Sequence, residues 1–142
     1  MVDRVLLYRK LEELETYQEQ LAEFAGISLN QYRGDWKSQR IVERTLQIMI
    51  ETCADIAGHI ISDGGMRAPK SYSDGFTVLK ENGVIPDALL DSLVRMAKFR
   101  NVVVHQYDEV DAEVVIAILQ KHLDTFREYR VQILQFLRGK RD

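Results

Sequence analysis

Cysteine and proline are nearly absent from this 142-residue chain, and it has neither long apolar runs nor a strong charge of one sign. Cys53 is the single cysteine, which excludes an intramolecular disulfide, a zinc site built from paired cysteines and a CxxC redox centre. Its place in an apolar helical row predicts an inert core residue. This cysteine usage is typical of a reducing compartment, and we expect a cytoplasmic protein.

The chain also lacks any stretch of about 18 uncharged apolar residues, and its N-terminal segment becomes charged almost at once. We therefore expect neither a signal peptide nor a membrane contact. The formal net charge of -3 argues against nucleic-acid binding over the whole surface, although it is compatible with a small basic cleft. No His, Cys, Asp or Glu spacing is typical of a metal site, so we expect no metal and no cofactor.

Pro69 and Pro86 are the two prolines, and along the long segments without proline the apolar residues recur with the helical period of 3.6. This pattern predicts helices over residues 3–24, 35–62, 74–81, 86–107 and 111–137. Four long helices with short connections, and one additional short helix, predict an all-α antiparallel four-helix bundle. The length predicts a single domain over residues 1–142.

The helix predicted over residues 35–62 is apolar around most of its circumference and has one narrow polar stripe. The stripe consists of Arg40, Arg44, Gln47, Glu51 and Asp55. A helix of this kind is usually central in its fold or covered by a second subunit. The stripe is either a solvated strip, which is the default, or one wall of a cleft. Trp36, beside the expected Asp35 cap, suggests no role beyond packing.

The segment KFRNVVVHQYD, residues 98–108, carries four polar side chains through a run of three valines. If the helix continues to Tyr107, then Arg100, Asn101, His105 and Tyr107 share one arc of about 160°. The imidazole of His105 can act as general base or acid, while Arg100 can hold a phosphate. Attack of an RNA 2′-hydroxyl on the adjacent phosphate requires a general base and a cation that binds the phosphate. On chemistry alone the pattern is weak, because such residues are more often surface or capping groups.

The three valines of this segment are poor helix formers, so their positions need a packing reason. At the helical period, Val102 and Val103 point into the bundle. Val104 lies between Arg100 and Asn101 on the polar arc. We therefore predict that Val104 contacts a partner subunit.

The pattern R-N-x-x-x-H-x-Y near the end of a helix resembles the HepT-like toxin family of the HEPN superfamily. The similarity extends upstream through PKSYSDGFTVLKENGVIPDALLDSLVRMAKF, and ERTLQIMIE resembles the family pattern as well. The resemblance implies a metal-independent endoribonuclease of a toxin–antitoxin pair. It also implies a homodimer whose motif helices face each other across a shared cleft. Arg100 and His105 are then the catalytic pair, Asn101 the polar residue beside the arginine, and Tyr107 the motif tyrosine.

The implied partner is a small nucleotidyltransferase antitoxin of the MntA type, which attaches AMP to the motif tyrosine. A bulky anion on Tyr107 would block an RNA phosphate sterically and by like charge. The candidates for a rim around the RNA site, each by default an ordinary solvated residue, are Arg67, Lys70, Tyr72, Arg95 and Lys98. The alternative is a non-catalytic helical adaptor that binds a nucleotidyltransferase and a nucleotide. A purely structural dimeric bundle is the third hypothesis.

Overall fold

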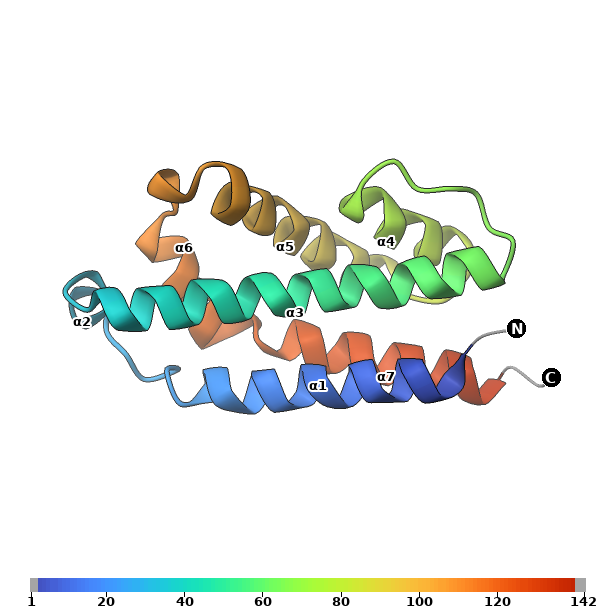
Figure 1. Ribbon diagram of the computed structural model, residues 1–142, viewed down its shortest axis with the longest axis horizontal. Helices are drawn as coiled ribbons and strands as arrows, with labels where there is room; N and C mark the ends of the chain where they lie inside the picture. Colours follow the sequence, from blue (N-terminus) through green and yellow to red (C-terminus); the bar gives the residue numbers. More distant parts are fainter. Residues whose placement is uncertain (1–2, 140–142) are drawn as a thin grey trace.

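The computed structural model describes residues 3–139, and within that range it contains helices and no strand. Four long helices lie along the long axis of the molecule and alternate in direction (Figure 1): α1 (Arg4–Ala22), α3 (Trp36–Asp63), α5 (Asp87–His105) and α7 (Asp124–Gly139). The shorter elements are α2 (Leu29–Arg33), α4 (Tyr72–Glu81), the 3-10 helix η1 (Tyr107–Glu109), α6 (Ala112–Ala117) and the π-helical segment η2 (Ile118–His122). The predicted all-α bundle is confirmed, with more short elements than we expected.

Side-chain caps fix where the helices begin. The predicted Asp35 cap of α3 is present, since its carboxylate accepts hydrogen bonds from the Ser38 backbone N–H at 3.2 Å and hydroxyl at 2.7 Å. These bonds lower the pKa of Asp35. Ser28 begins α2 with a capping box to Gln31. At the other end of α3 the chain turns through Gly65, whose φ of 63° suits glycine.

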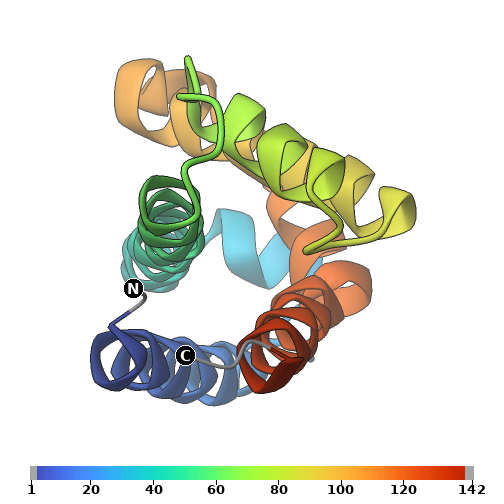
Figure 2. The same cartoon turned by 90° about the vertical axis from the view of Figure 1, so that its right-hand side faces the viewer.

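Helix α3 lies between α1 on one side and α4 and α5 on the other (Figure 2). Its apolar row is fully buried, as the sequence predicts, and consists of Val42, Leu46, Met49, Cys53, Ile56 and Ile60. Cys53 is a buried core residue, as predicted, and burial raises the pKa of its thiol. Tyr129 on α7 donates a buried hydrogen bond of 2.8 Å to the Cys53 carbonyl oxygen and packs edge-on against Phe76 of α4. These contacts hold α3, α4 and α7 together.

Two of the predicted helices differ from those in the structure. The helix predicted to reach Tyr107 ends at His105, and Gln106 leaves the helical region with φ −141° and ψ 46°. Residues 104–109 are all exposed, so no apolar face keeps another helical turn packed. The single helix predicted over residues 111–137 is divided into α6, η2 and α7. The π-helical segment inserts extra residues into the turn and shifts the helical register.

Candidate active site

The guanidinium group of Arg100 is held by a carboxylate on the neighbouring helix. Its Nε and Nη2 atoms both donate to Oε2 of Glu51, at 2.9 and 2.8 Å. Its Nη1 atom donates to Oδ1 of Asn101 at 3.3 Å. Gln47, one turn before Glu51 on α3, donates to the same Glu51 oxygen at 3.2 Å. Arg100 therefore points from α5 toward α3, with a fixed orientation.

A third helix contributes to the same place. The Tyr72 ring at the start of α4 lies under Arg100, with 4.7 Å between the ring centroid and the guanidinium carbon. Stacking on a ring and pairing with a carboxylate both restrict a guanidinium group to one plane. The Arg100 side chain is 19% exposed, so one edge still reaches solvent. Glu51, Thr52, Asp55 and Tyr72 line the hollow beside it. The polar stripe of α3 is thus one wall of a cleft, the second of our two interpretations.

Asn101 and His105 occupy a neighbouring face of α5. Both are exposed, and they lie one turn apart. Arg100 and His105 are about 140° apart around the helix axis, so within one chain they point in different directions. Lys98 shares the Asn101 and His105 face, three and seven residues before them. The structure therefore brings Arg100 to the groove between α3 and α5, whereas His105 is exposed on another face of α5.

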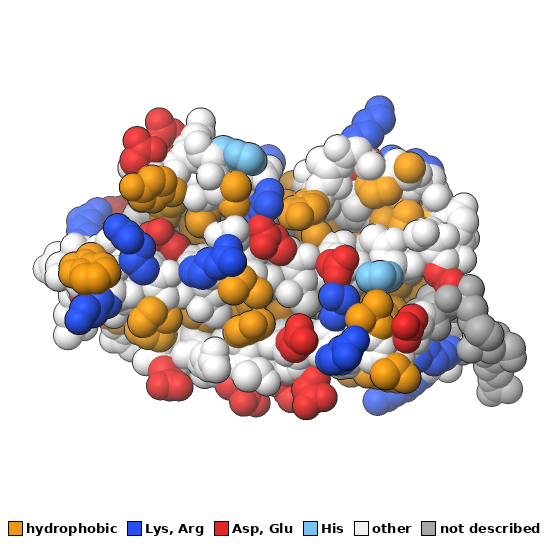
Figure 3. All heavy atoms as spheres, in the orientation of Figure 1, with side chains coloured by type: hydrophobic (Ala, Val, Ile, Leu, Met, Phe, Trp, Pro, Cys, Tyr) orange, Lys and Arg blue, Asp and Glu red, His pale blue; other side chains and the backbone are white. Residues whose placement is uncertain are grey.

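Tyr107 lies outside α5, in η1, and its side chain is 66% exposed. The predicted arc of four residues on one helix is therefore wrong for Tyr107. Instead, Tyr107 lines a surface hollow of about 260 Å³ with residues of α3 and α5: Arg40, Glu43, Arg44, Gln47 and Val103. The tyrosine hydroxyl is accessible and has cations nearby. Figure 3 shows Lys and Arg side chains gathered over the N-terminal half of α3 on this face.

The three valines at residues 102–104 differ in how deeply they are buried. Val103 is buried, as predicted, whereas Val102 is only half-buried. Val104 is 39% exposed in the single chain. Its contact with a partner subunit stays a prediction.

The predicted rim residues are scattered. Arg67 is occupied by two carboxylates, Asp74 at 2.8 Å and Glu81 at 2.9 Å. The Arg67 guanidinium lowers the pKa of Asp74 to about 2. Lys70 is exposed on the loop before α4, and its backbone N–H donates to Asp74. Of the five rim residues, Tyr72 is the one that contacts Arg100.

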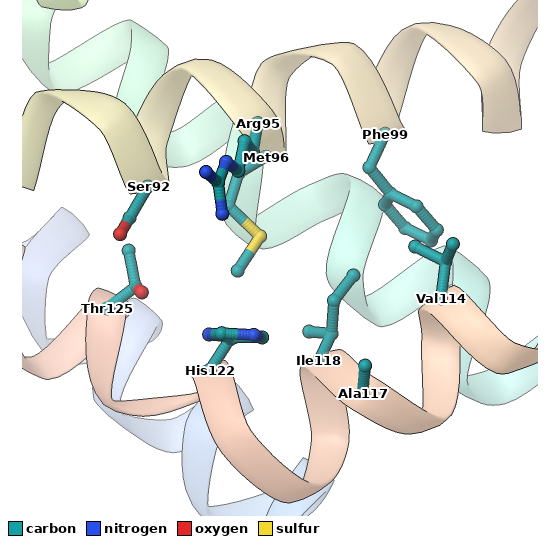
Figure 4. A pocket seen from close by; sticks show the side chains of 9 residues that line it. All are labelled: Ser92, Arg95, Met96, Phe99, Val114, Ala117, Ile118, His122 and Thr125. Carbon is teal, nitrogen blue, oxygen red and sulfur yellow. The ribbon is translucent and has the colours of Figure 1, made fainter.

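Arg95 lies at a different hollow. It lines a pocket of about 210 Å³ between α5 and the segment from α6 to α7, together with Met96, Phe99, Ile118 and His122 (Figure 4). Because Arg95 is five residues before Arg100, the two side chains are about 140° apart on α5. A role for Arg95 in RNA binding stays a prediction, and it does not belong to the groove that holds Arg100.

Within residues 3–139, no group of three or more His, Cys, Asp or Glu side chains is placed to hold a metal ion. Over the same range, no helix is long and apolar enough to cross a membrane. The candidate site thus consists of arginine side chains on α3 and α5, the exposed His105 and the exposed Tyr107.

Comparison with known proteins decides the family. Residues 14–133 match the family described as "Ribonuclease HepT-like". This chain belongs to the HepT-like ribonuclease family. A relative from Shewanella oneidensis, the mRNA nuclease HepT, is 36% identical over 100 residues, which cover 70% of this chain and 75% of the relative. The tRNA nuclease HepT of Aphanizomenon flos-aquae is 29% identical over 138 residues, which cover 96% of this chain and 92% of the relative.

A solved structure extends the similarity to the whole fold. The tri-AMPylated HEPN toxin of Shewanella oneidensis, in complex with an MNT antitoxin, superimposes with a TM-score of 0.85 at 30% identity. The match covers 95% of this chain and 99% of the toxin. The resemblance to HepT-like proteins that the motif suggested is therefore confirmed.

Several residues of this candidate site were not singled out from the sequence. Glu51 and Gln47 were seen only as members of a polar stripe, as were Arg40 and Arg44. The polar stripe was the sequence feature from which these residues could have been identified. The sequence does not show which residue of α5 pairs with which residue of α3, because Arg100 lies 49 positions after Glu51 in the chain.

Proposed function

We propose that this HepT-like protein is an endoribonuclease toxin that cleaves RNA without a metal, with Arg100 and His105 as the catalytic pair. The observation that carries the proposal is the fixed orientation of Arg100 between Glu51 and Tyr72. A guanidinium group has five N–H donors, and three of them are used by Glu51 and Asn101. The two that remain suit the two non-bridging oxygens of a phosphodiester.

The chemistry follows from these groups. Neutral His105 accepts the proton of the RNA 2′-hydroxyl, and the 2′-oxygen attacks the adjacent phosphorus. The bond from phosphorus to the 5′-oxygen breaks, and the leaving oxygen takes a proton from the solvent. The exposed His105 is itself in contact with this solvent. Arg100 stabilises the charge that develops on the phosphoryl oxygens. Asn101 orients Arg100 through its side-chain oxygen. The products are a 2′,3′-cyclic phosphate and a free 5′-hydroxyl.

The divergence of Arg100 and His105 on one helix supports a site shared by two protomers. In a homodimer with α5 helices facing each other, His105 of one protomer can approach a phosphate held by Arg100 of the other. Val104 lies between these side chains on α5, and an exposed valine there suits a subunit contact. We propose this homodimer, with the site at its interface and residues 1–142 as one HEPN-like domain, as the active form in the cytoplasm.

An MntA-type nucleotidyltransferase is the proposed antitoxin. The Tyr107 oxygen attacks the α-phosphorus of ATP, pyrophosphate leaves, and AMP becomes esterified to the tyrosine. The exposure of Tyr107 supports this role, because a buried hydroxyl would not reach a second enzyme's active site. The complex of a related HEPN toxin with an MNT antitoxin, in which the toxin is tri-AMPylated, supports the same partner class.

The test is cleavage of RNA by purified protein in the presence of EDTA, together with growth after induction. His105→Ala should lower kcat by about 10²- to 10⁴-fold, because it removes the general base. His122→Ala is the matched control, since it removes another exposed histidine from a different face. After co-expression with the antitoxin, intact mass should show added AMP in wild type and none in Tyr107→Phe. If wild type binds the nucleotidyltransferase but cleaves no RNA, the adaptor hypothesis replaces this one.

A further inference from the structure

Trp36 is the first residue of α3, and its side chain is 62% exposed. Our expectation that it serves packing is therefore wrong. Two cations lie against its ring instead: Nζ of Lys37 is 5.7 Å from the centroid, and the guanidinium carbon of Arg40 is 5.8 Å from it. An exposed indole held by cations presents a flat apolar surface edged by positive charge.

The same helix face leads from Trp36 to the candidate active site. Trp36, Arg40 and Arg44 are spaced four residues apart, so they form one row on α3. Arg40 and Arg44 also line the hollow that contains Tyr107. The row then continues toward Glu51, which holds Arg100. From Trp36 to Glu51 the helix rises by about 22 Å.

The two arginines of this row form no salt bridge with a described carboxylate. Within the described residues, neither Arg40 nor Arg44 has a carboxylate within ion-pair distance, whereas Arg67 and Arg130 have one or more. Glu43 lines the hollow too; its carboxylate accepts a hydrogen bond from Tyr32 and interacts electrostatically with Arg40, but at more than salt-bridge distance. In a protein with a net charge of -3, phosphate binding needs such a local strip of unpaired cations.

We propose that Trp36, Lys37, Arg40 and Arg44, hereafter the α3 track, bind the single-stranded RNA that flanks the scissile phosphate. One unpaired base stacks on the Trp36 indole, and the backbone phosphates contact the three cations. A single strand is the form that fits, because a base inside a duplex has no free face for the indole. This inference rests on the proposed function and names the substrate class of the same groove.

The chain supplies its own probe for this contact, since Trp36 is the single tryptophan. Its fluorescence reports base stacking directly. The experiment titrates the full-length His105→Ala protein, which binds RNA without turnover, with a single-stranded RNA of about 12 nucleotides and with the matching duplex. We expect saturable quenching by the single strand, and weaker quenching by the duplex at the same phosphate concentration.

Substitutions in the track then separate binding from chemistry. In the active protein, Trp36→Ala should raise KM on the order of 10-fold and leave kcat unchanged, and Trp36→Phe should recover much of the loss. Arg40→Ala and Arg44→Ala should each reduce the salt dependence of log Kd by a slope of about 0.7. Tyr8→Ala and Arg9→Ala on α1 are the matched controls, since both side chains are exposed on a different helix.

Three outcomes overturn the inference. The first is unchanged Trp36 fluorescence with saturating RNA. The second is wild-type KM in Trp36→Ala. The third is a homodimer that dissociates in Trp36→Ala on size-exclusion chromatography, because Trp36 then belongs to the subunit contact. These results differ from failure of the proposed function, in which wild type shows no cleavage even if Trp36-dependent RNA binding is present.

Discussion

Replacing Glu51 with glutamine tests whether the position of Arg100 matters for cleavage. Glu51→Gln keeps the size of the side chain and one oxygen acceptor, but it removes the charge that two Arg100 donors share at 2.9 and 2.8 Å. A hydrogen bond to a charged group contributes about 1.5–3 kcal/mol. Because the two side chains are 19% and 30% exposed, screening by solvent reduces the stability loss to roughly 1 kcal/mol.

The expected effect on catalysis is larger than the effect on stability. Displacement of a group that contacts the reacting phosphate by about 1 Å costs on the order of 100-fold in rate. We therefore expect kcat of Glu51→Gln to fall by about 10- to 100-fold. KM should stay the same or decrease, because Arg100 loses its neutralising partner and attracts phosphate more strongly. A residue with a purely structural role would not separate kcat from KM in this direction.

The assay is steady-state cleavage of a fluorophore-quencher RNA, with thermal unfolding measured on the same samples. Asp55→Asn is the matched control, since Asp55 lies one turn further along the same stripe and pairs with Lys10 instead. Asp55→Asn also removes one negative charge from α3, but Asp55 does not contact Arg100. Equal kcat values for Glu51→Gln and Asp55→Asn, in a protein that Arg100→Ala inactivates, would refute the positioning role.

Two further predictions concern stability. Tyr129→Phe removes the buried hydrogen bond to the Cys53 carbonyl and should lower the free energy of unfolding by about 1 kcal/mol in urea denaturation, with RNA cleavage unchanged. Asp74 has its folded pKa lowered to about 2 by Arg67, below the ordinary value of 3.8, so its contribution is present above about pH 4 and lost as the pH falls toward 2. Asp74→Asn should therefore unfold at a lower temperature than wild type at pH 7, and the difference should shrink toward pH 2; a constant difference across that range would contradict the assignment.

Local signals in the sequence predicted much of the fold. The period of the apolar residues in α3 gave its buried row, and Asp35 marked its first turn. Such signals arise from contacts between residues three or four apart, which a single sequence displays directly. The end of α5 at His105 was not predicted, because the helix ends where packing ends and not at a glycine or proline.

The candidate site could be predicted only in part. Arg100 and His105 were identified through the motif, but the direction of Arg100 depends on Glu51, which is distant in sequence. Arg67 illustrates the opposite case. As a residue type it suggests phosphate binding, and yet Asp74 and Glu81 occupy its donors. Pairing between helices decides whether a cation is available, and a single sequence does not show that pairing.

The position of Tyr107 outside α5 explains how modification could silence the proposed nuclease. On a continued helix, its side chain would lie about 20° from Arg100, toward the packed face of α5. In η1 it is exposed and lines the hollow with Arg40 and Arg44. The phosphate of an esterified AMP would then be placed beside two unpaired arginines of the α3 track. Because one phosphate excludes another from the same cations, AMP on Tyr107 would compete with RNA along α3 without having to reach Arg100.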